Sequence, residues 1–143
     1  MTNTRITDPE VLEVRYPLIL RTYSIRKDSG GAGKFIGGNG VVREMEFLED
    51  IQVSILSERR AFAPQGLLGG QNGRRAMTIY VRPDGVEVNF GGKNTDHFKA
   101  GSKLKILTSG GGGYGDSKER GNEKDNENKD PKALFMTGSI GNQ

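Results

Sequence analysis

Glycine constrains this sequence most, because it is concentrated at three places and not spread evenly along the chain. Of the 22 glycines in 143 residues, six lie between Gly30 and Gly40, four between Gly66 and Gly73, and five between Gly110 and Gly115. A residue without a Cβ permits a positive φ or the close approach of another backbone segment. We therefore expect the three clusters to hold fixed backbone geometry in a folded chain and not to act as flexible linkers.

Between the clusters, apolar residues recur with a period of two, which is typical of half-buried strands. The pattern is found in residues 18–25, 41–48, 51–57, 76–82, 86–90 and 103–109. Pro83-Asp84-Gly85 predicts a hairpin turn between two of these strands. One short helix is predicted in "TDPEVLEVRYP", with Asp8 as its N-cap and Pro9 at its first position. The fold class is therefore mainly β: an antiparallel, sandwich-like domain with one short N-terminal helix and a polar C-terminal tail.

The tail differs in composition from the rest of the chain. Residues 116–132 contain no apolar side chain, so they cannot bury enough surface to offset the entropy of ordering them. We expect one domain over residues 1–115, a flexible polar spacer over 116–132, and a short terminal segment over 133–143.

Composition excludes several classes of function. The chain has no cysteine and one histidine, so a cysteine nucleophile and a cysteine-ligated zinc site are excluded, and we expect no metal site. The first 115 residues hold 16 Lys and Arg against 12 Asp and Glu, a weaker bias than nucleic-acid binding usually requires. No apolar run has the length of a signal peptide core or a membrane span. We expect a cytoplasmic protein with no nucleic-acid or membrane partner.

The segment "SGGGGYGD" contains G-x-G-x-x-G at Gly110, Gly112 and Gly115. A dinucleotide site needs a helix directly after this motif, and a Walker A loop needs Gly-Lys-Ser/Thr; the sequence has neither. Two interpretations remain, an anion-binding nest of backbone amides and a corner required by backbone geometry. Our hypothesis is that Gly110 to Gly113 form a corner packed on the Gly30 to Gly40 loop, with any anion contact secondary.

No catalytic residue can be named from the sequence. Ser29 lacks the glycine two positions earlier that G-x-S-x-G requires, since Lys27 stands there. His97 lies in "KNTDHFKAG", which has the composition of a polar loop. Arginine forks suit carboxylates and phosphates, and structural or interface pairing is the other interpretation. The candidate anion or substrate contacts are Arg26, Ser29, Arg59, Arg60, Gly111, Gly112 and Gly113.

Four segments in order resemble the C-terminal part of the hydantoinase B/oxoprolinase family. They are "MTNTRITDPEVLEVRYPLIL", "DSGGAGKFIGGNGVVREMEF", "SILSERRAFAPQGLLGGQNGRR" and "TSGGGGYGD". The resemblance spans about residues 1–116 and is greatest to the eukaryotic 5-oxoprolinases. It implies that Met1 corresponds to an internal methionine and that the chain is a terminal fragment or a truncated gene product.

The resemblance also implies a function: ATP-dependent hydrolysis of the lactam of 5-oxo-L-proline to L-glutamate. ATP and Mg²⁺ are implied for the full-length enzyme, bound outside this segment, and no cofactor is expected on this chain. The implied partner is the remainder of the oxoprolinase chain or subunit, in an oligomeric full-length form. We expect the isolated chain to be inactive. The alternative is a noncatalytic β-domain that serves as an assembly or interaction module.

Overall fold

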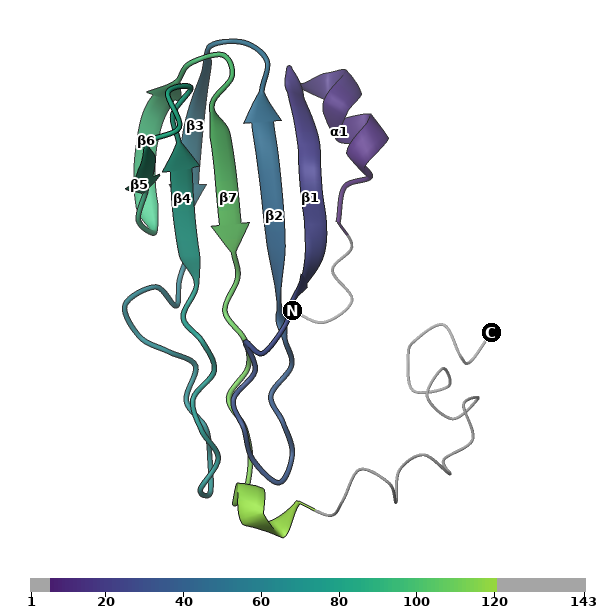
Figure 1. Cartoon of the computed structure of the whole chain (residues 1–143), viewed down its shortest axis with the longest axis vertical. Helices are drawn as coiled ribbons and strands as arrows, with labels where there is room; N and C mark the ends of the chain where they lie inside the picture. The colour runs from purple at the N-terminus through teal and green to yellow at the C-terminus, as the bar shows by residue number, and fades with distance from the viewer. Residues whose placement is uncertain (1–5, 121–143) are drawn as a thin grey trace. The chain divides into compact units, whose positions relative to one another are not determined.

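The computed structural model describes residues 6–120, and Figure 1 shows their arrangement. The elements are α1 (Pro9–Arg15), β1 (Leu18–Arg26), β2 (Gly40–Phe47), β3 (Ile51–Leu56), β4 (Met77–Val81), β5 (Glu87–Asn89), β6 (Lys93–Phe98), β7 (Lys103–Leu107) and the 3₁₀ helix η1 (Ser117–Glu119). The predicted spacer beyond residue 120 and the segment 133–143 lie outside the described residues. Within residues 6–120, no helix is long and apolar enough to cross a membrane.

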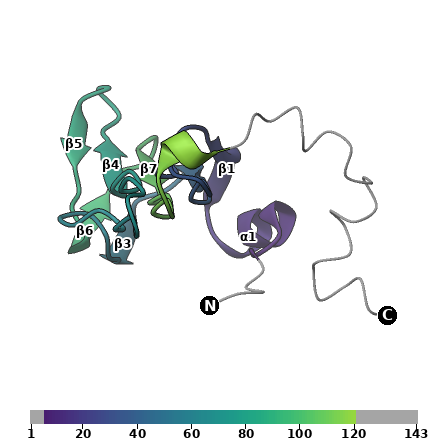
Figure 2. The same ribbon diagram turned by 90° about the horizontal axis from the view of Figure 1, so that it is seen from below.

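The strands form two antiparallel sheets, which confirms the mainly β prediction. Five strands pair in the order β1-β2-β7-β4-β5, and β3 pairs with β6 in a separate two-stranded sheet. Figure 2 shows α1 below β1 and the β3–β6 pair below β4, on the same side of the five-stranded sheet. We call this side the inner face and the opposite side the outer face.

The helix and the hairpin lie where the sequence predicts them. The Asp8 carboxylate accepts a hydrogen bond from the Glu10 amide at 2.9 Å, and Pro9 occupies the first turn. Tyr16 is already extended because a proline follows it, so the helix ends after two turns. Gly85 has a φ of +86°, which is why glycine is needed in the turn between β4 and β5.

The sequence prediction of a polar loop around His97 is wrong. Residues Lys93–Phe98 form β6, which pairs with β3 over its whole length. Every β6 side chain except Phe98 is exposed, so the strand has no apolar alternation to reveal it. Backbone pairing with β3 and a single buried aromatic residue are sufficient to hold it.

Aromatic side chains fill the core between the sheets. Phe98 is fully buried. It stacks on Tyr80 with ring centroids 3.9 Å apart and meets Phe47 and Phe90 edge to face at 5.4 and 5.1 Å. Leu104 completes the cluster from the central strand β7. The two edge-to-face pairs, Phe98 with Phe47 and with Phe90, are of the kind that stabilises a core beyond the area it buries.

Below the sheets, three segments run side by side without forming helix or ladder (Figure 1). We call residues 29–40, 64–74 and 109–115 the glycine layer. Each pair of segments is joined by backbone hydrogen bonds, for example Gly31 N to Gly111 O at 2.8 Å, Gln71 N to Ala32 O at 2.7 Å and Gly113 N to Gln71 O at 2.8 Å. The layer is thus held by main-chain groups from three distant parts of the sequence.

The glycines are needed here for space. An ideal Cβ on Gly112 would lie 1.9 Å from Gln65 O, and one on Gly110 would lie 1.9 Å from Ser29 O. Neither glycine has a positive φ. The predicted contact with the Gly30 to Gly40 loop is confirmed, but the predicted corner is wrong, because residues 110–113 contain no turn or bend.

Candidate functional site

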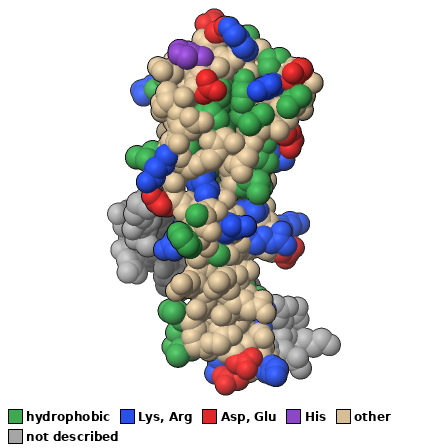
Figure 3. All heavy atoms as spheres, turned by 90° about the vertical axis from the view of Figure 1, so that its left-hand side faces the viewer, with side chains coloured by type: hydrophobic (Ala, Val, Ile, Leu, Met, Phe, Trp, Pro, Cys, Tyr) green, Lys and Arg blue, Asp and Glu red, His purple; other side chains and the backbone are tan. Residues whose placement is uncertain are grey.

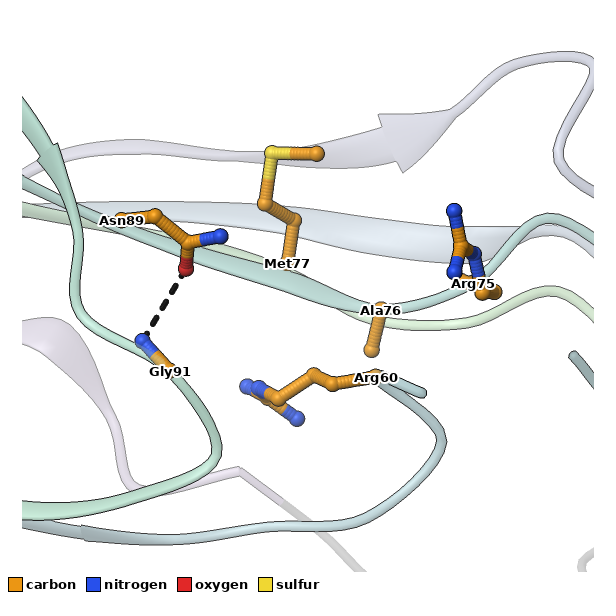
Figure 4. Close-up of a pocket in the computed structure, with 6 residues that line it drawn as sticks. All are labelled: Arg60, Arg75, Ala76, Met77, Asn89 and Gly91. Carbon is orange, nitrogen blue, oxygen red and sulfur yellow. Dashed lines mark hydrogen bonds between the residues drawn. The ribbon is translucent and has the colours of Figure 1, made fainter. Parts of the chain in front are cut away.

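Two hollows adjoin Arg60, where the lower end of β4 meets the glycine layer. The first has a volume of about 210 Å³ and is lined by Arg60, Arg75, Ala76, Met77, Asn89 and Gly91 (Figure 4). The second, of about 310 Å³, is lined in part by Glu58, Arg59, Arg60 and Lys93. Arg60 is therefore the charged side chain common to both hollows.

Arg60 is held by a buried hydroxyl. Its Nε donates to Thr78 Oγ1 at 3.2 Å and its Nη2 donates to the same oxygen, while Nη1 donates to Glu58 O at 3.0 Å. Thr78 is fully buried. The Arg60 stem passes Gly92 so closely that a Cβ there would lie 2.8 Å from Cδ. Partial burial lowers the pKa of Arg60 from its ordinary value, against a smaller opposing effect of Glu58.

A guanidinium carries five N–H groups, and three of those on Arg60 have partners within the described residues. The other two remain for a ligand or for solvent. Figure 4 shows the Arg60 guanidinium extending toward Asn89 and Gly91, whereas that of Arg75 lies on the other side of the backbone at Ala76. The two guanidinium groups do not converge on one point, so Arg60 alone is placed to meet an anion in the first hollow.

The other arginines of this region cap backbone carbonyls or face solvent. Arg26 Nη1 donates to Arg75 O and Thr108 O, both at 2.8 Å, and Arg75 Nη1 donates to Ala61 O at 3.3 Å. Burial lowers the pKa of Arg26, and the charge of Arg74 lowers it further. Arg59 is exposed and has a φ of +62°, a conformation that a non-glycine residue seldom adopts.

The region is positively charged. Glu58 lines the second hollow but forms an exposed ion pair with Lys93 at 3.6 Å. Figure 3 shows Lys and Arg side chains gathered across the middle of this face, above a lower part that is mostly backbone and neutral polar atoms. An anionic ligand or a partner carboxylate is the chemistry that such a surface favours.

Ser29 is fully buried and hydrogen-bonded. Its hydroxyl donates to Arg26 O at 2.6 Å and accepts from the Gly40 amide at 2.8 Å. The side chain thus joins the end of β1 to the start of β2. Within residues 6–120, the hydroxyl has no basic side chain among its hydrogen-bond partners.

Most backbone amides of the glycine run 110–113 already donate hydrogen bonds to carbonyl oxygens of other segments. Gly110, Gly111 and Gly113 donate to Arg74 O, Gly38 O and Gln71 O at 3.2, 2.8 and 2.8 Å. An anion nest needs successive free amides, so Gly111 and Gly113 are not placed to form one with Gly112. Among residues 6–120, no group of three or more His, Asp or Glu side chains could hold a metal ion.

The sequence does not point to Thr78 or Asn89 as contributors to this region. Thr78 has the pattern of an ordinary strand residue, and nothing in its neighbourhood signals that it holds Arg60. Arg75 and Asn89 line the first hollow because strand pairing brings β4 and β5 together. The Arg74-Arg75 pair, which precedes β4, is one of two arginine pairs whose sequence suggests either ligand contact or structural pairing.

Comparison with known proteins assigns the family. The model of the hydantoinase B/oxoprolinase family matches residues 1–117. The chain belongs to the hydantoinase B/oxoprolinase family. It is 54% identical to 5-oxoprolinase 1 of Arabidopsis thaliana over 115 residues, and 52% identical to the 5-oxoprolinase of Saccharomyces cerevisiae over 111 residues. These alignments cover 80% and 77% of this chain but only 9% of each relative.

Solved structures of larger enzymes contain the same fold. The ATP-dependent caprolactamase of Pseudomonas jessenii superposes with a TM-score of 0.69 at 30% identity, over 82% of this chain and 21% of that chain. An acetone carboxylase superposes with a TM-score of 0.65 over 96% of this chain and 24% of that one, and at 16% identity this likeness concerns the fold alone. This chain thus corresponds to about a fifth of the caprolactamase chain and about a quarter of the acetone carboxylase chain.

Proposed function

We propose that this chain is the C-terminal part of a 5-oxoprolinase-like enzyme, which hydrolyses the lactam of 5-oxo-L-proline to L-glutamate with ATP. The observation that carries the proposal is the identity of 50–54% to proteins named 5-oxoprolinase. In the complete enzyme, ATP and Mg²⁺ would bind outside this segment. We infer a cytoplasmic, oligomeric enzyme in which this segment is structural support for the hydrolysing part.

The hydrogen bonds of the candidate residues support a structural role for this segment. Ser29 and the amides of Gly110, Gly111 and Gly113 hold segments of this chain together. Groups committed to internal hydrogen bonds contribute shape and stability, and they are not free for proton transfer or nucleophilic attack. Arg60 is the exception, because two of its N–H groups have no described partner.

Two proteins test the proposal. The first is the 143-residue chain, incubated with 5-oxo-L-proline, ATP and Mg²⁺; we expect no ADP and no glutamate. The second is a chimera, Arabidopsis 5-oxoprolinase 1 carrying this chain in place of its matching segment; we expect it to form ADP and glutamate. A folded chimera that forms neither product would contradict the proposed reaction, and turnover by the isolated chain would contradict the structural role.

Arg60 allows a finer test in the chimera. If it binds the carboxylate of the substrate, Arg60→Lys should raise KM by at least about tenfold, the equivalent of about 1.4 kcal/mol, with little change in kcat. Arg75→Lys is the matched control, because its guanidinium points away from Arg60. An unchanged KM in Arg60→Lys would leave Arg60 with a structural role only.

A noncatalytic interaction module is the second candidate, and an uncovered part of the inner face favours it. Tyr23 and Ile25 are 50% and 66% exposed on that face. This candidate predicts that the chain associates with its partner while the chimera forms no glutamate. Measuring association and product formation on the same preparations separates the two functions.

A further inference from the structure

Residues 6–120 cover the inner face of the five-stranded sheet over only part of its length. Near the upper end of the sheet in Figure 1, where α1 and β3 lie, side chains of β3 and Leu12 of α1 pack on the core. Farther along β1, Tyr23 and Ile25 remain half or more exposed. We call Tyr23, Ile25, Val41, Arg43 and Ile106 the open inner face.

Strand register places these residues together. Arg43 lies opposite Tyr23 on β1 and opposite Ile106 on β7, and Ile25 lies opposite Val41. Directly opposed residues of antiparallel strands share a face of the sheet. Four apolar side chains therefore surround one arginine.

Arg43 is the unusual member. Its Nε is buried and has no hydrogen-bond partner, and its guanidinium forms no ion pair among residues 6–120. A buried donor without an acceptor is destabilising, more so on a charged group. By contrast, Arg26 and Arg60 have found acceptors for their guanidinium groups. On the open inner face, the described residues thus provide no hydrogen-bond acceptor for Arg43 Nε, which lies beside apolar side chains.

The missing acceptor has an evident source in the family. This chain spans 9% of the 5-oxoprolinases of Arabidopsis, Dictyostelium and Saccharomyces and about a fifth of the caprolactamase chain. We propose that a segment from the remainder of the oxoprolinase polypeptide docks on the open inner face, with a carboxylate against Arg43 and apolar side chains against Tyr23 and Ile25. The proposal rests on the proposed role of this chain as part of a larger enzyme.

A second copy of this chain fits the face poorly. In a two-fold dimer each patch meets the same patch of its partner. The open inner face contains no acidic residue, so such a dimer would bring two Arg43 side chains together without supplying a carboxylate. Like charges at an interface are unfavourable, and the segment from the remainder of the polypeptide is the better occupant.

Hydroxyl-radical labelling with mass spectrometry tests the docking. Tyr23 should label readily in the isolated 143-residue chain and be protected in the chimera, where its labelling rate should fall toward that of the buried Tyr80 (9% exposed). Three results would overturn the proposal: equal labelling of Tyr23 in both proteins, protection of Tyr23 already in the isolated monomer, or protection that appears only with dimers of the isolated chain.

Substitution tests the carboxylate. Arg43→Met should not lower the melting temperature of the isolated chain, because it removes an unpartnered donor, yet in the chimera it should abolish the protection of Tyr23. Lys105→Met is the matched control: it lies on the neighbouring strand β7, is half-buried, and belongs to the outer face. Equal protection in the two variants would overturn the role of Arg43. Labelling is read without substrate, so its failure is distinct from failure of the proposed reaction.

Discussion

The amide of Gly31 donates a 2.8 Å hydrogen bond to the carbonyl oxygen of Gly111, and the amide of Gly111 donates one of the same length to Gly38. Both main-chain polar groups of Gly111, its carbonyl and its amide, are thus hydrogen-bonded to the loop between β1 and β2. Because the bonds are between main-chain groups, the spacing between the segments is that of backbone against backbone. The room that a Cβ would have depends on whether a neighbouring backbone lies on that side of the glycine, so it differs sharply among the glycines of this layer.

This difference predicts a graded series of alanine substitutions. Gly112→Ala should destabilise the chain by about 1–3 kcal/mol or more, since a Cβ would lie 1.9 Å from Gln65 O and the backbone must move. Gly111→Ala should cost less, because the nearest atom is 3.2 Å away. Gly38→Ala meets nothing within 4 Å and should be neutral or stabilising by about 0.4–1 kcal/mol.

Urea denaturation measures the series, repeated with and without phosphate. We expect the order Gly112, Gly111, Gly38 from most to least destabilised, independent of phosphate. Equal costs at all three positions, or a cost at Gly112 that appears only with phosphate present, would contradict the close-packing explanation.

Removal of the Ser29 hydroxyl should be costly. Ser29→Ala leaves the buried Gly40 amide and the Arg26 carbonyl without that partner, and we expect a loss of about 1–3 kcal/mol in the free energy of unfolding. Ser54→Ala is the control, because its hydroxyl bonds Thr95 at an exposed position; its effect should stay within about 0.5 kcal/mol. Similar losses in the two variants would show that burial of the Ser29 hydroxyl is unimportant.

Arg60 and Thr78 should behave as a coupled pair. Thr78→Val keeps the shape of the buried side chain but removes the acceptor of Arg60, and we expect a loss of about 1–3 kcal/mol. Arg60→Met in the same background should cost less than it does alone, with a coupling energy of about 0.5–3 kcal/mol. A double-mutant cycle by chemical denaturation provides the measurement, and strictly additive effects would mean that the bond contributes nothing.

Glu46 should make stability depend on pH in the acid range. On the outer face it accepts a 2.9 Å hydrogen bond from Arg21, with Lys103 at 3.8 Å. The hydrogen bond from Arg21 holds the pKa of Glu46 below its ordinary value. A lowered pKa contributes stability that is present above the unfolded pKa, about 4.3, and is lost as the pH falls through the folded value.

Thermal melts at low salt from pH 7 to pH 3 should therefore show a smaller decrease in Glu46→Gln than in the wild type. Arg21→Met should flatten the profile in the same way, because it removes the donor. About 1 M salt should reduce the difference between wild type and variants, since both partners are at the surface. Parallel profiles for all three proteins would show that this pair does not contribute.

Strand positions were predictable from sequence wherever one face is apolar. On β2, the buried Met45 and Phe47 alternate with outward-facing residues, as their burial requires. On β4, the apolar alternation of Met77, Ile79 and Val81 predicts the strand but the wrong buried face, because the structure buries Thr78 and Tyr80 instead. The strand β6 escaped prediction because only Phe98 faces the core. Pairing of such a strand depends on its neighbour β3, and no local pattern carries that information.

The candidate site was less predictable for the same kind of reason. Ser29 and the glycine run stood out as chemically suggestive, but Ser29 bonds to main-chain groups of Arg26 and Gly40, and the glycine amides bond to carbonyl oxygens of distant loops. Backbone acceptors have no sequence signature. Arg43 did have one, because it interrupts the apolar series Val41, Met45, Phe47 at a position that alternation assigns to the inner face.

The glycine layer also determines how this protein should respond to temperature. The aromatic core around Phe98 buries apolar surface, whose exposure raises the heat capacity of unfolding, so its stabilising effect weakens on cooling. The layer buries peptide groups with few side chains, and exposure of polar surface lowers that heat capacity. Cooling therefore weakens the sheets relative to the glycine layer, and heating has the opposite effect.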